Sequence, residues 1–223
     1  TCTFVSSSGT PTYVTNFSVA TTGTTPAGTY PIVIIGTGDG KSRNATFTIK
    51  ARINVVTPSA GTVGSWVTVI GDGFKDIETI KVLFGTTGTI PIDYWTSGGT
   101  FSAAFTVDTQ PYGTTSVVVV GLSSELRCES KFSIVENLIL VSPQKGTVGS
   151  LVTVAGNGFG GTELIQLDFG TKSTITTITT DNKGAFLVSF TVNTQYYATK
   201  TIRVTGLITE RMLISFFKIT PDV

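Results

Sequence analysis

The hexapeptide GNGFGG at residues 156–161 has the residue types and spacing of a dinucleotide-binding loop. In such G-x-G-x-x-G loops a strand precedes the glycines, and the N-terminus of a following helix points at the pyrophosphate. Here the next segment, ELIQLDFG, alternates polar and apolar residues with a period of two, which indicates a strand. A loop between two strands offers no helix dipole to a phosphate. The glycines are therefore interpreted as residues of a tight turn that needs positive φ.

Histidine is absent from all 223 residues, and this removes much of the usual catalytic and metal-binding chemistry. The two cysteines, Cys2 and Cys128, form neither a disulfide framework nor a zinc site, and Cys128 is expected to be a buried thiol. The net charge of +1 provides no basic footprint for nucleic acid. No apolar run approaches the roughly 20 residues of a membrane-spanning helix. We expect no catalytic residues and no cofactor.

Three carboxylates, Asp72, Asp76 and Glu78, follow one another closely and are candidate calcium ligands. Calcium takes six to eight oxygen ligands, often from loop carboxylates. The competing interpretation is a solvated turn, because a related segment further along the chain offers only Asn157 and Glu163.

Aromatic and glycosylation signals are also present. Tyr94 and Trp95 form a candidate platform for a sugar ring or a protein partner, and a loop tip folded onto its own domain is the alternative. Trp66 is expected to pack near a domain junction. Asn16 and Asn44 satisfy the N-glycosylation pattern.

The chain contains an internal repeat with a constant offset between its copies. The segment PSAGTVGSWVTVIGDGFKDIETIKVLFG at 58–85 matches PQKGTVGSLVTVAGNGFGGTELIQLDFG at 143–170, and at the same offset the segment 26–49 matches 111–134. We therefore predict a partial or atypical immunoglobulin-like domain at 1–54 and two complete domains at 55–138 and 139–223.

Period-two alternation assigns the inward face of each strand in both copies. The inward residues of the middle copy are Val67, Val69, Ile80, Val82, Phe84, Phe101, Ala103, Phe105, Val107, Val117, Val119, Phe132 and Ile134. Those of the last copy are Val152, Val154, Ile165, Leu167, Phe169, Phe186, Val188, Phe190, Val192, Ile202, Val204, Phe217 and Ile219. About seven short strands in each copy predict an all-β fold of tandem immunoglobulin-like β-sandwiches.

The motif P-x-x-G-T-V-G-x-x-V-T-V-x-G-x-G-F…F-G, present in both copies, resembles the start of an IPT/TIG immunoglobulin-like repeat. Residues 26–49 resemble the end of bacterial immunoglobulin-like repeats. Such repeats are common in prokaryotic cell-surface and surface-layer proteins, and the composition is similar to surface-layer chains such as those of anammox bacteria. The resemblance implies a secreted, self-assembling glycoprotein at the cell surface. Transcription factors with TIG domains carry basic DNA-contacting regions that this chain lacks.

The last predicted strand differs between the copies at its outward positions. Arg127, Glu129 and Lys131 suit a solvated edge, whereas the last copy has an outward row of apolar residues, Met212, Ile214 and Phe216. We interpret this row as an interface with another subunit or domain. A covering loop and a register slip of one residue are the alternatives. Val118 and Val120, matched by Arg203 and Thr205, are a second candidate contact.

Neither domain boundary carries a Gly/Ser linker, so neighbouring domains are expected to keep a fixed orientation. The leading hypothesis is a non-enzymatic structural module that assembles with itself into a surface layer. The alternative is an adhesive or carbohydrate-binding surface protein that binds cell-envelope glycan. A third hypothesis is the accessory part of a secreted glycan-active enzyme. Because the chain begins at Thr1 without a leader, it is interpreted as a mature chain or a fragment.

Overall fold

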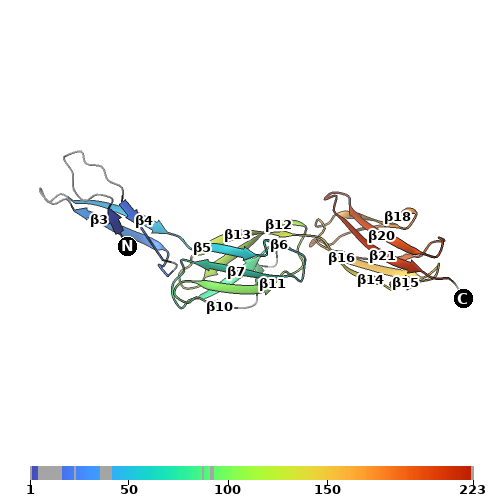
Figure 1. The fold of residues 1–223 in the computed structure, drawn as a ribbon, viewed down its shortest axis with the longest axis horizontal. Coiled ribbons are helices and arrows are strands. Elements are labelled where there is room, and N and C mark those ends of the chain that lie inside the picture. Colours follow the sequence, from blue (N-terminus) through green and yellow to red (C-terminus); the bar gives the residue numbers. More distant parts are fainter. Residues whose placement is uncertain are drawn as a thin grey trace.

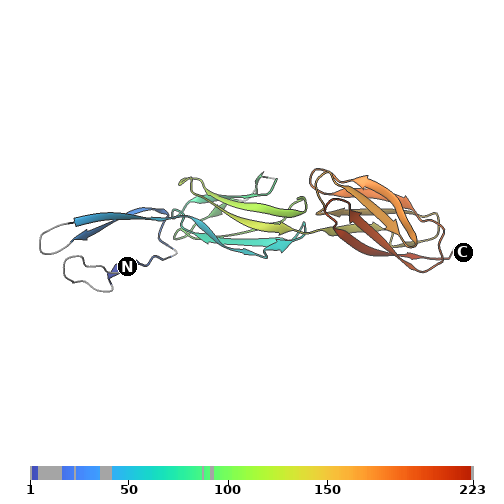
Figure 2. The same cartoon turned by 90° about the horizontal axis from the view of Figure 1, so that it is seen from above.

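The computed structural model describes residues 2–4, 17–22, 24–35, 42–86, 88–90 and 93–221. Every regular element in these ranges is a β-strand, as expected from the alternating sequence pattern. None of the described segments is a helix that could span a membrane. An N-terminal part made of two small strand pairs, a middle sandwich and a last sandwich follow one another in a row from the N-terminus to the C-terminus (Figures 1 and 2).

The N-terminal part consists of two antiparallel strand pairs. β1 (Cys2–Phe4) pairs with β2 (Phe17–Val19), and β3 (Gly28–Ile35) pairs with β4 (Ser42–Ile49). Gly28 lies opposite Ile49, just as Gly113 lies opposite Ile134 in the middle sandwich. The repeat therefore extends to the pairing register of this hairpin.

The middle sandwich packs a three-stranded sheet, β11-β7-β5, against the sheet β10-β8-β12-β13-β6, with β9 paired to β8. Its strands are β5 (Arg52–Thr57), β6 (Ala60–Gly61), β7 (Trp66–Asp72), β8 (Thr79–Phe84), β9 (Gly88–Thr89), β10 (Tyr94–Trp95), β11 (Phe101–Thr106), β12 (Gly113–Gly121) and β13 (Arg127–Ile134). The chain enters through β5 in one sheet and crosses to β6, which pairs in parallel with β13 of the other sheet. This split first strand is a feature of immunoglobulin-like sandwiches.

The last sandwich repeats this arrangement with the sheets β14-β16-β19 and β15-β21-β20-β17-β18. Its strands are β14 (Asn137–Ser142), β15 (Lys145–Gly146), β16 (Leu151–Asn157), β17 (Leu164–Phe169), β18 (Lys172–Thr179), β19 (Phe186–Thr191), β20 (Thr199–Gly206) and β21 (Met212–Ile219). β15 again pairs in parallel with the end of the last strand.

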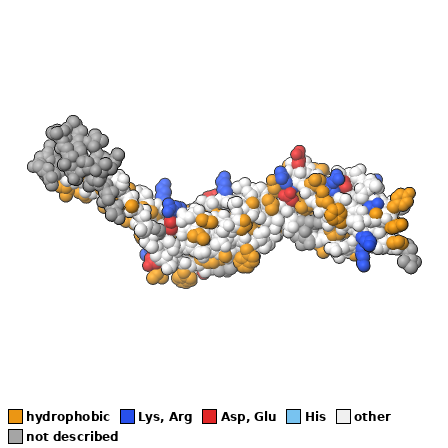
Figure 3. All heavy atoms as spheres, in the orientation of Figure 1, with side chains coloured by type: hydrophobic (Ala, Val, Ile, Leu, Met, Phe, Trp, Pro, Cys, Tyr) orange, Lys and Arg blue, Asp and Glu red, His pale blue; other side chains and the backbone are white. Residues whose placement is uncertain are grey.

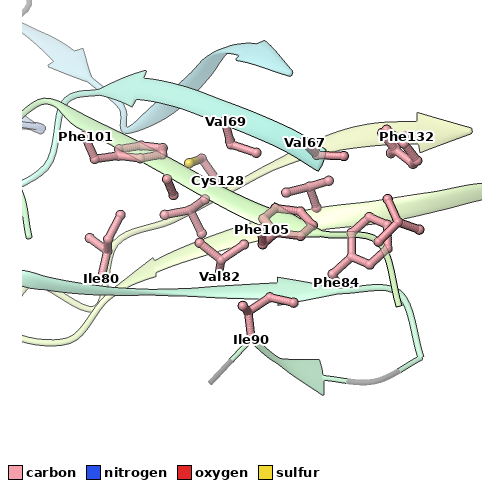
Figure 4. Packing of buried hydrophobic residues seen from close by; sticks show 14 of the residues in the cluster. Val67, Val69, Ile80, Val82, Phe84, Ile90, Phe101, Phe105, Cys128 and Phe132 are labelled. Atoms are coloured by element: carbon pink, nitrogen blue, oxygen red, sulfur yellow. The ribbon is translucent and has the colours of Figure 1, made fainter. Parts of the chain in front are cut away.

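The core of each sandwich lies between its two sheets, where the inward side chains of facing strands meet. Figure 4 shows this core for the middle sandwich. The predicted inward residues are buried there, except Val188, which is partly buried and packs against the same core. Phenylalanine rings interlock in matching positions: Phe84 contacts Phe105 and Phe132, with ring centroids 5.2 and 5.6 Å away. Phe169 contacts Phe190 and Phe217 at 5.0 and 5.8 Å.

The prediction of an all-β fold with tandem immunoglobulin-like sandwiches is confirmed. The limits at 54 and 138 stay predictions. The assumption of a gap-free offset is wrong in one place. The hydroxyls of Thr96 and Thr180 accept the same hydrogen bonds, from the N–H groups of Glu78 and Glu163, although the constant offset would align Thr96 with the residue after Thr180. Tyr94 therefore matches Ile178, because these two residues lie opposite Ile80 and Ile165.

Candidate functional site

The G-x-G-F turns that resemble a nucleotide loop lie where the chain enters each sandwich. Gly73 has φ of 85° and Gly158 has φ of 75°, a backbone region that favours glycine. A Cβ atom at Gly73 would lie 2.8 Å from the carbonyl oxygen of Lys50. At Gly158 it would lie 2.5 Å from the carbonyl oxygen of Val135. The glycines thus let the entering segment pass close against the turn.

The same turns accept hydrogen bonds from the preceding unit. The Ala27 N–H donates to the Gly73 carbonyl oxygen at 2.7 Å, and the Tyr112 N–H donates to the Phe159 carbonyl oxygen at 2.7 Å. Ala27 and Tyr112 occupy matching positions of the repeat, so the two junctions use the same loop of the preceding unit. At the second junction the guanidinium carbon of Arg211 also lies 4.6 Å from the centre of the Tyr112 ring, a cation–π contact.

A buried glutamate closes the adjacent end of each sandwich. Glu78 is 2% exposed and Glu163 is 1% exposed. The Glu78 carboxylate accepts hydrogen bonds from the backbone N–H groups of Lys75, Ser123 and Ser124 at 2.8–3.2 Å, and from both serine hydroxyls. It therefore ties the G-x-G-F turn to the turn between the last two strands.

Glu163 makes the corresponding contacts in the last sandwich. Its carboxylate accepts hydrogen bonds from the N–H groups of Gly160, Ile208 and Thr209 at 2.6–2.7 Å, and from the Thr209 hydroxyl. Burial alone would raise the pKa of both glutamates, but these hydrogen bonds outweigh it and hold each pKa below the ordinary value of 4.5.

The three calcium candidates are not brought together. Asp72 accepts hydrogen bonds from Arg52 at 3.0 and 3.1 Å and from Asn54 at 2.9 Å, whereas Asp76 accepts one from the Gly98 N–H at 2.7 Å. Glu78 is surrounded by donors. Within the described ranges no group of three His, Cys, Asp or Glu side chains is arranged to hold a metal ion.

The aromatic candidates separate in the same way. Tyr94 packs against the core, and its hydroxyl donates a hydrogen bond to the Ala104 carbonyl oxygen. Trp95, the next residue of β10, is 67% exposed, so the two rings do not form the expected joint platform. The prediction for Trp66 is wrong, because this residue is 69% exposed on β7 and does not pack in a junction.

Asn44 is exposed on β4, whereas Asn16 lies outside the described residues. Cys128 is buried as expected, and burial together with the charge of Asp72 raises the pKa of its thiol to about 12.

The outward row of β21 is exposed. Met212 is 50% exposed, Ile214 51% and Phe216 62%, while Phe217 and Ile219 are in the core. Within the described part of the chain, the row is thus neither turned inward by a register slip of one residue nor covered by a loop. Apolar side chains reach the surface of the last sandwich among scattered charges (Figure 3). Val118 is only 6% exposed and Val120 is half-buried, so the second candidate contact is wrong for Val118.

Sequence reasoning missed an open cleft of about 470 Å³ at the first junction. Threonine hydroxyls, the Arg52–Asp72 ion pair and the partly buried Phe47 and Ile49 line it. It also missed the structural role of Glu78 and Glu163. The signal available in the sequence was that a glutamate stands at this matching position in both copies, although the residues of the turns around it differ.

No protein-family model and no curated protein sequence matches the chain. Among solved structures it is similar to the Yersinia pseudotuberculosis adhesin InvE, with 13% identity, 77% of this chain and 59% of that chain covered, and a TM-score of 0.34. A tetra-tandem repeat in the extending region of a large adhesion protein has 10% identity, coverage of 86% and 56%, and a TM-score of 0.39. The BSP domain of a biofilm-associated protein has 14% identity, coverage of 77% and 30%, and a TM-score of 0.28. The chain thus spans less than two thirds of each of these structures.

Proposed function

We propose that the chain is a non-enzymatic structural module of a self-assembling cell-surface layer, located outside the cell. The repeated junction carries this proposal, because at both boundaries a matching residue of the preceding unit, Ala27 or Tyr112, donates a backbone hydrogen bond to a G-x-G-F turn. A junction without a flexible Gly/Ser linker limits the range of distances between neighbouring units. The exposed row of Met212, Ile214 and Phe216 supplies a lateral contact.

The test is negative-stain electron microscopy with light scattering on the purified chain, with and without calcium. Ordered sheets or oligomers that Phe216→Glu disperses support the proposal. The control is Leu187→Glu, because Leu187 is 63% exposed on the opposite sheet of the same sandwich. A monodisperse monomer under every condition contradicts self-assembly through this chain.

The second candidate is an adhesive or carbohydrate-binding surface protein. The exposed ring of Trp95 favours it, as does the hydroxyl-lined cleft at the first junction. An indole can stack on the apolar face of a sugar, and hydroxyl and carboxylate groups can bind its hydroxyls. Binding to isolated cell-envelope glycan that is lost in Trp95→Ala but kept in Trp66→Ala supports this candidate.

A further inference from the structure

One edge of the last sandwich has open backbone hydrogen-bonding groups beside the apolar row. β15 pairs with β21 only at Lys218 and Ile219, so within the described structure residues 212–217 have a neighbour on one side only, β20. The N–H groups of Lys218 and Thr220 donate to Gln144 and Gly146, across the β15 side. By the period of two, the N–H and C=O groups of Met212, Ile214 and Phe216 point to this same open side.

We infer that this edge pairs with β21 of a second copy of the chain, antiparallel and centred on Ile214. In that alignment Ile214 lies opposite Ile214, and Met212 lies opposite Phe216 on either side of it. All three pairs are of the hydrogen-bonded kind, so the two edges exchange about six backbone hydrogen bonds. The sheets of the two copies then join into one continuous sheet, with apolar cross-strand pairs on its outer face.

The charges at the strand ends favour this occupant. Glu210 lies two residues before Met212 and Lys218 lies two residues after Phe216, and both are exposed. Antiparallel pairing therefore brings the Glu210 end of each strand toward the Lys218 end of the other, where Lys218 itself is paired with β15. A parallel pairing would instead place like charges side by side at both ends.

In the middle sandwich the corresponding edge strand, β13, has charged outward residues in place of the apolar ones of β21. Ser133 and Val135 of its last segment donate to the β6 side, as Lys218 and Thr220 do to the β15 side. The equivalent alignment of β13 would place Glu129 against Glu129 and Arg127 against Lys131 twice. Like charges directly opposite each other oppose pairing, and charged edge strands generally prevent it. Of the two described sandwiches, the last thus has the edge strand whose side chains are compatible with pairing to the same strand of a second copy.

This inference rests on the proposed function, because it assigns the lateral contact of that function to one edge. The first experiment measures the molecular mass of the full chain against concentration by analytical ultracentrifugation. A reversible dimer is expected, and Ile214→Glu, which recreates the Glu129 arrangement, is expected to weaken it about 100-fold. Leu187→Glu should leave the dimer unchanged. A chain that stays monomeric, or a dimer insensitive to Ile214→Glu, overturns the inference.

Two further variants test backbone pairing rather than side-chain contact. Ile214→Ala and Ile214→Pro both remove the apolar side chain, but only proline removes the N–H that faces the open edge, and proline is tolerated there within a sheet. The proline variant should dimerise more weakly than the alanine variant, while both keep their circular dichroism spectrum. Equal dimerisation by the two folded variants contradicts strand pairing.

The orientation is tested by cysteine cross-linking in a Cys2→Ser background with an added thiol oxidant, Cys128 being buried. A mixture of Met212→Cys and Phe216→Cys chains should form the mixed disulfide, because hydrogen-bonded antiparallel partners lie within disulfide reach. A dominant Met212→Cys homodimer would indicate parallel pairing and overturn the alignment. A dimer that forms no ordered sheets in electron microscopy would contradict the surface layer but not the edge pairing. Ordered sheets that persist in Ile214→Glu would contradict the edge pairing but not the surface layer.

Discussion

Tyr112 and Phe159 join the middle and last sandwiches through a single backbone hydrogen bond of 2.7 Å. At the preceding boundary the matching donor, the Ala27 N–H, donates to the Gly73 carbonyl oxygen, which lies one position earlier in the turn than the acceptor Phe159. Both boundaries thus join the same loop of the preceding unit to a G-x-G-F turn, through acceptors that are one position apart in the repeat. The G-x-G-F motif therefore functions here as a docking turn for the neighbouring unit.

Gly158→Ala should disturb the second junction more than the conformation of the glycine alone would explain. Gly158 and Gly149 both have positive φ, but an added Cβ meets the Val135 carbonyl at 2.5 Å in the first case and nothing within 4 Å in the second. We expect Gly149→Ala to cost about 1 kcal/mol and Gly158→Ala roughly 2 kcal/mol more. Urea unfolding measures both, and equal costs would remove the role assigned to the junction.

Tyr112→Ala should loosen the arrangement of the two sandwiches without unfolding either. The change removes the ring beneath the Arg211 guanidinium, a contact of about 0.5–1 kcal/mol at an exposed site. Small-angle X-ray scattering should show a broader distribution of interatomic distances. The matched control is Tyr197→Ala, the equivalent residue of the last sandwich, which is 72% exposed. A profile unchanged in both variants would contradict this prediction.

Glu163→Gln should destabilise the last sandwich by about 2–4 kcal/mol. Both carboxylate oxygens of Glu163 accept hydrogen bonds from backbone N–H groups, so the amide nitrogen of glutamine must face a donor. Glu78→Gln should act alike in the middle sandwich, whose Glu78 has the same environment. Thermal unfolding measures the loss. Glu129→Gln, an exposed substitution, is the control and should have little effect.

Stability should fall in acid because of the same two glutamates. Their folded-state pKa is below the ordinary value of 4.5, so the unfolded chain takes up protons first as the pH drops. Their stabilisation is complete above that value and is lost as the pH falls through the folded pKa. Urea midpoints measured from pH 6 down to about pH 3 should decline, and the Glu78→Gln, Glu163→Gln double variant should decline less steeply.

The Cys128 thiol should be inert in the folded chain. A buried thiol with a pKa of about 12 holds almost no thiolate near pH 8. In a Cys2→Ser background, Ellman's reagent should label Cys128 only after denaturation. Rapid labelling of the native protein would show that the middle core opens readily.

Strand faces could be predicted from the sequence because alternation is a local property. A residue such as Phe84 or Phe169 needs only its neighbours in the chain to show that it faces inward. The exposure of Met212, Ile214 and Phe216 was predictable for the same reason. The charged residues at the matching positions of β13 made the difference visible.

Contacts between distant segments could not be obtained this way. Tyr94 and Trp95 are adjacent in the sequence, yet the Tyr94 ring packs on the core and the Trp95 ring is exposed. The gap-free repeat misaligned this segment by one position, because the loops after β10 and β18 differ in length while Thr96 and Thr180 keep the same partners.

The sequence by itself determined the all-β character, the internal repeat, the buried faces and the outward apolar row, because each depends on residue type and short-range spacing. The tertiary structure alone decided that Glu78 is a buried acceptor of backbone hydrogen bonds, that the G-x-G-F turn receives the neighbouring unit, and that the edge of β21 is open within the described residues. These depend on which donors and acceptors meet between segments far apart in the chain. That meeting is set by the packing of the two sheets and by the path of the chain between sandwiches.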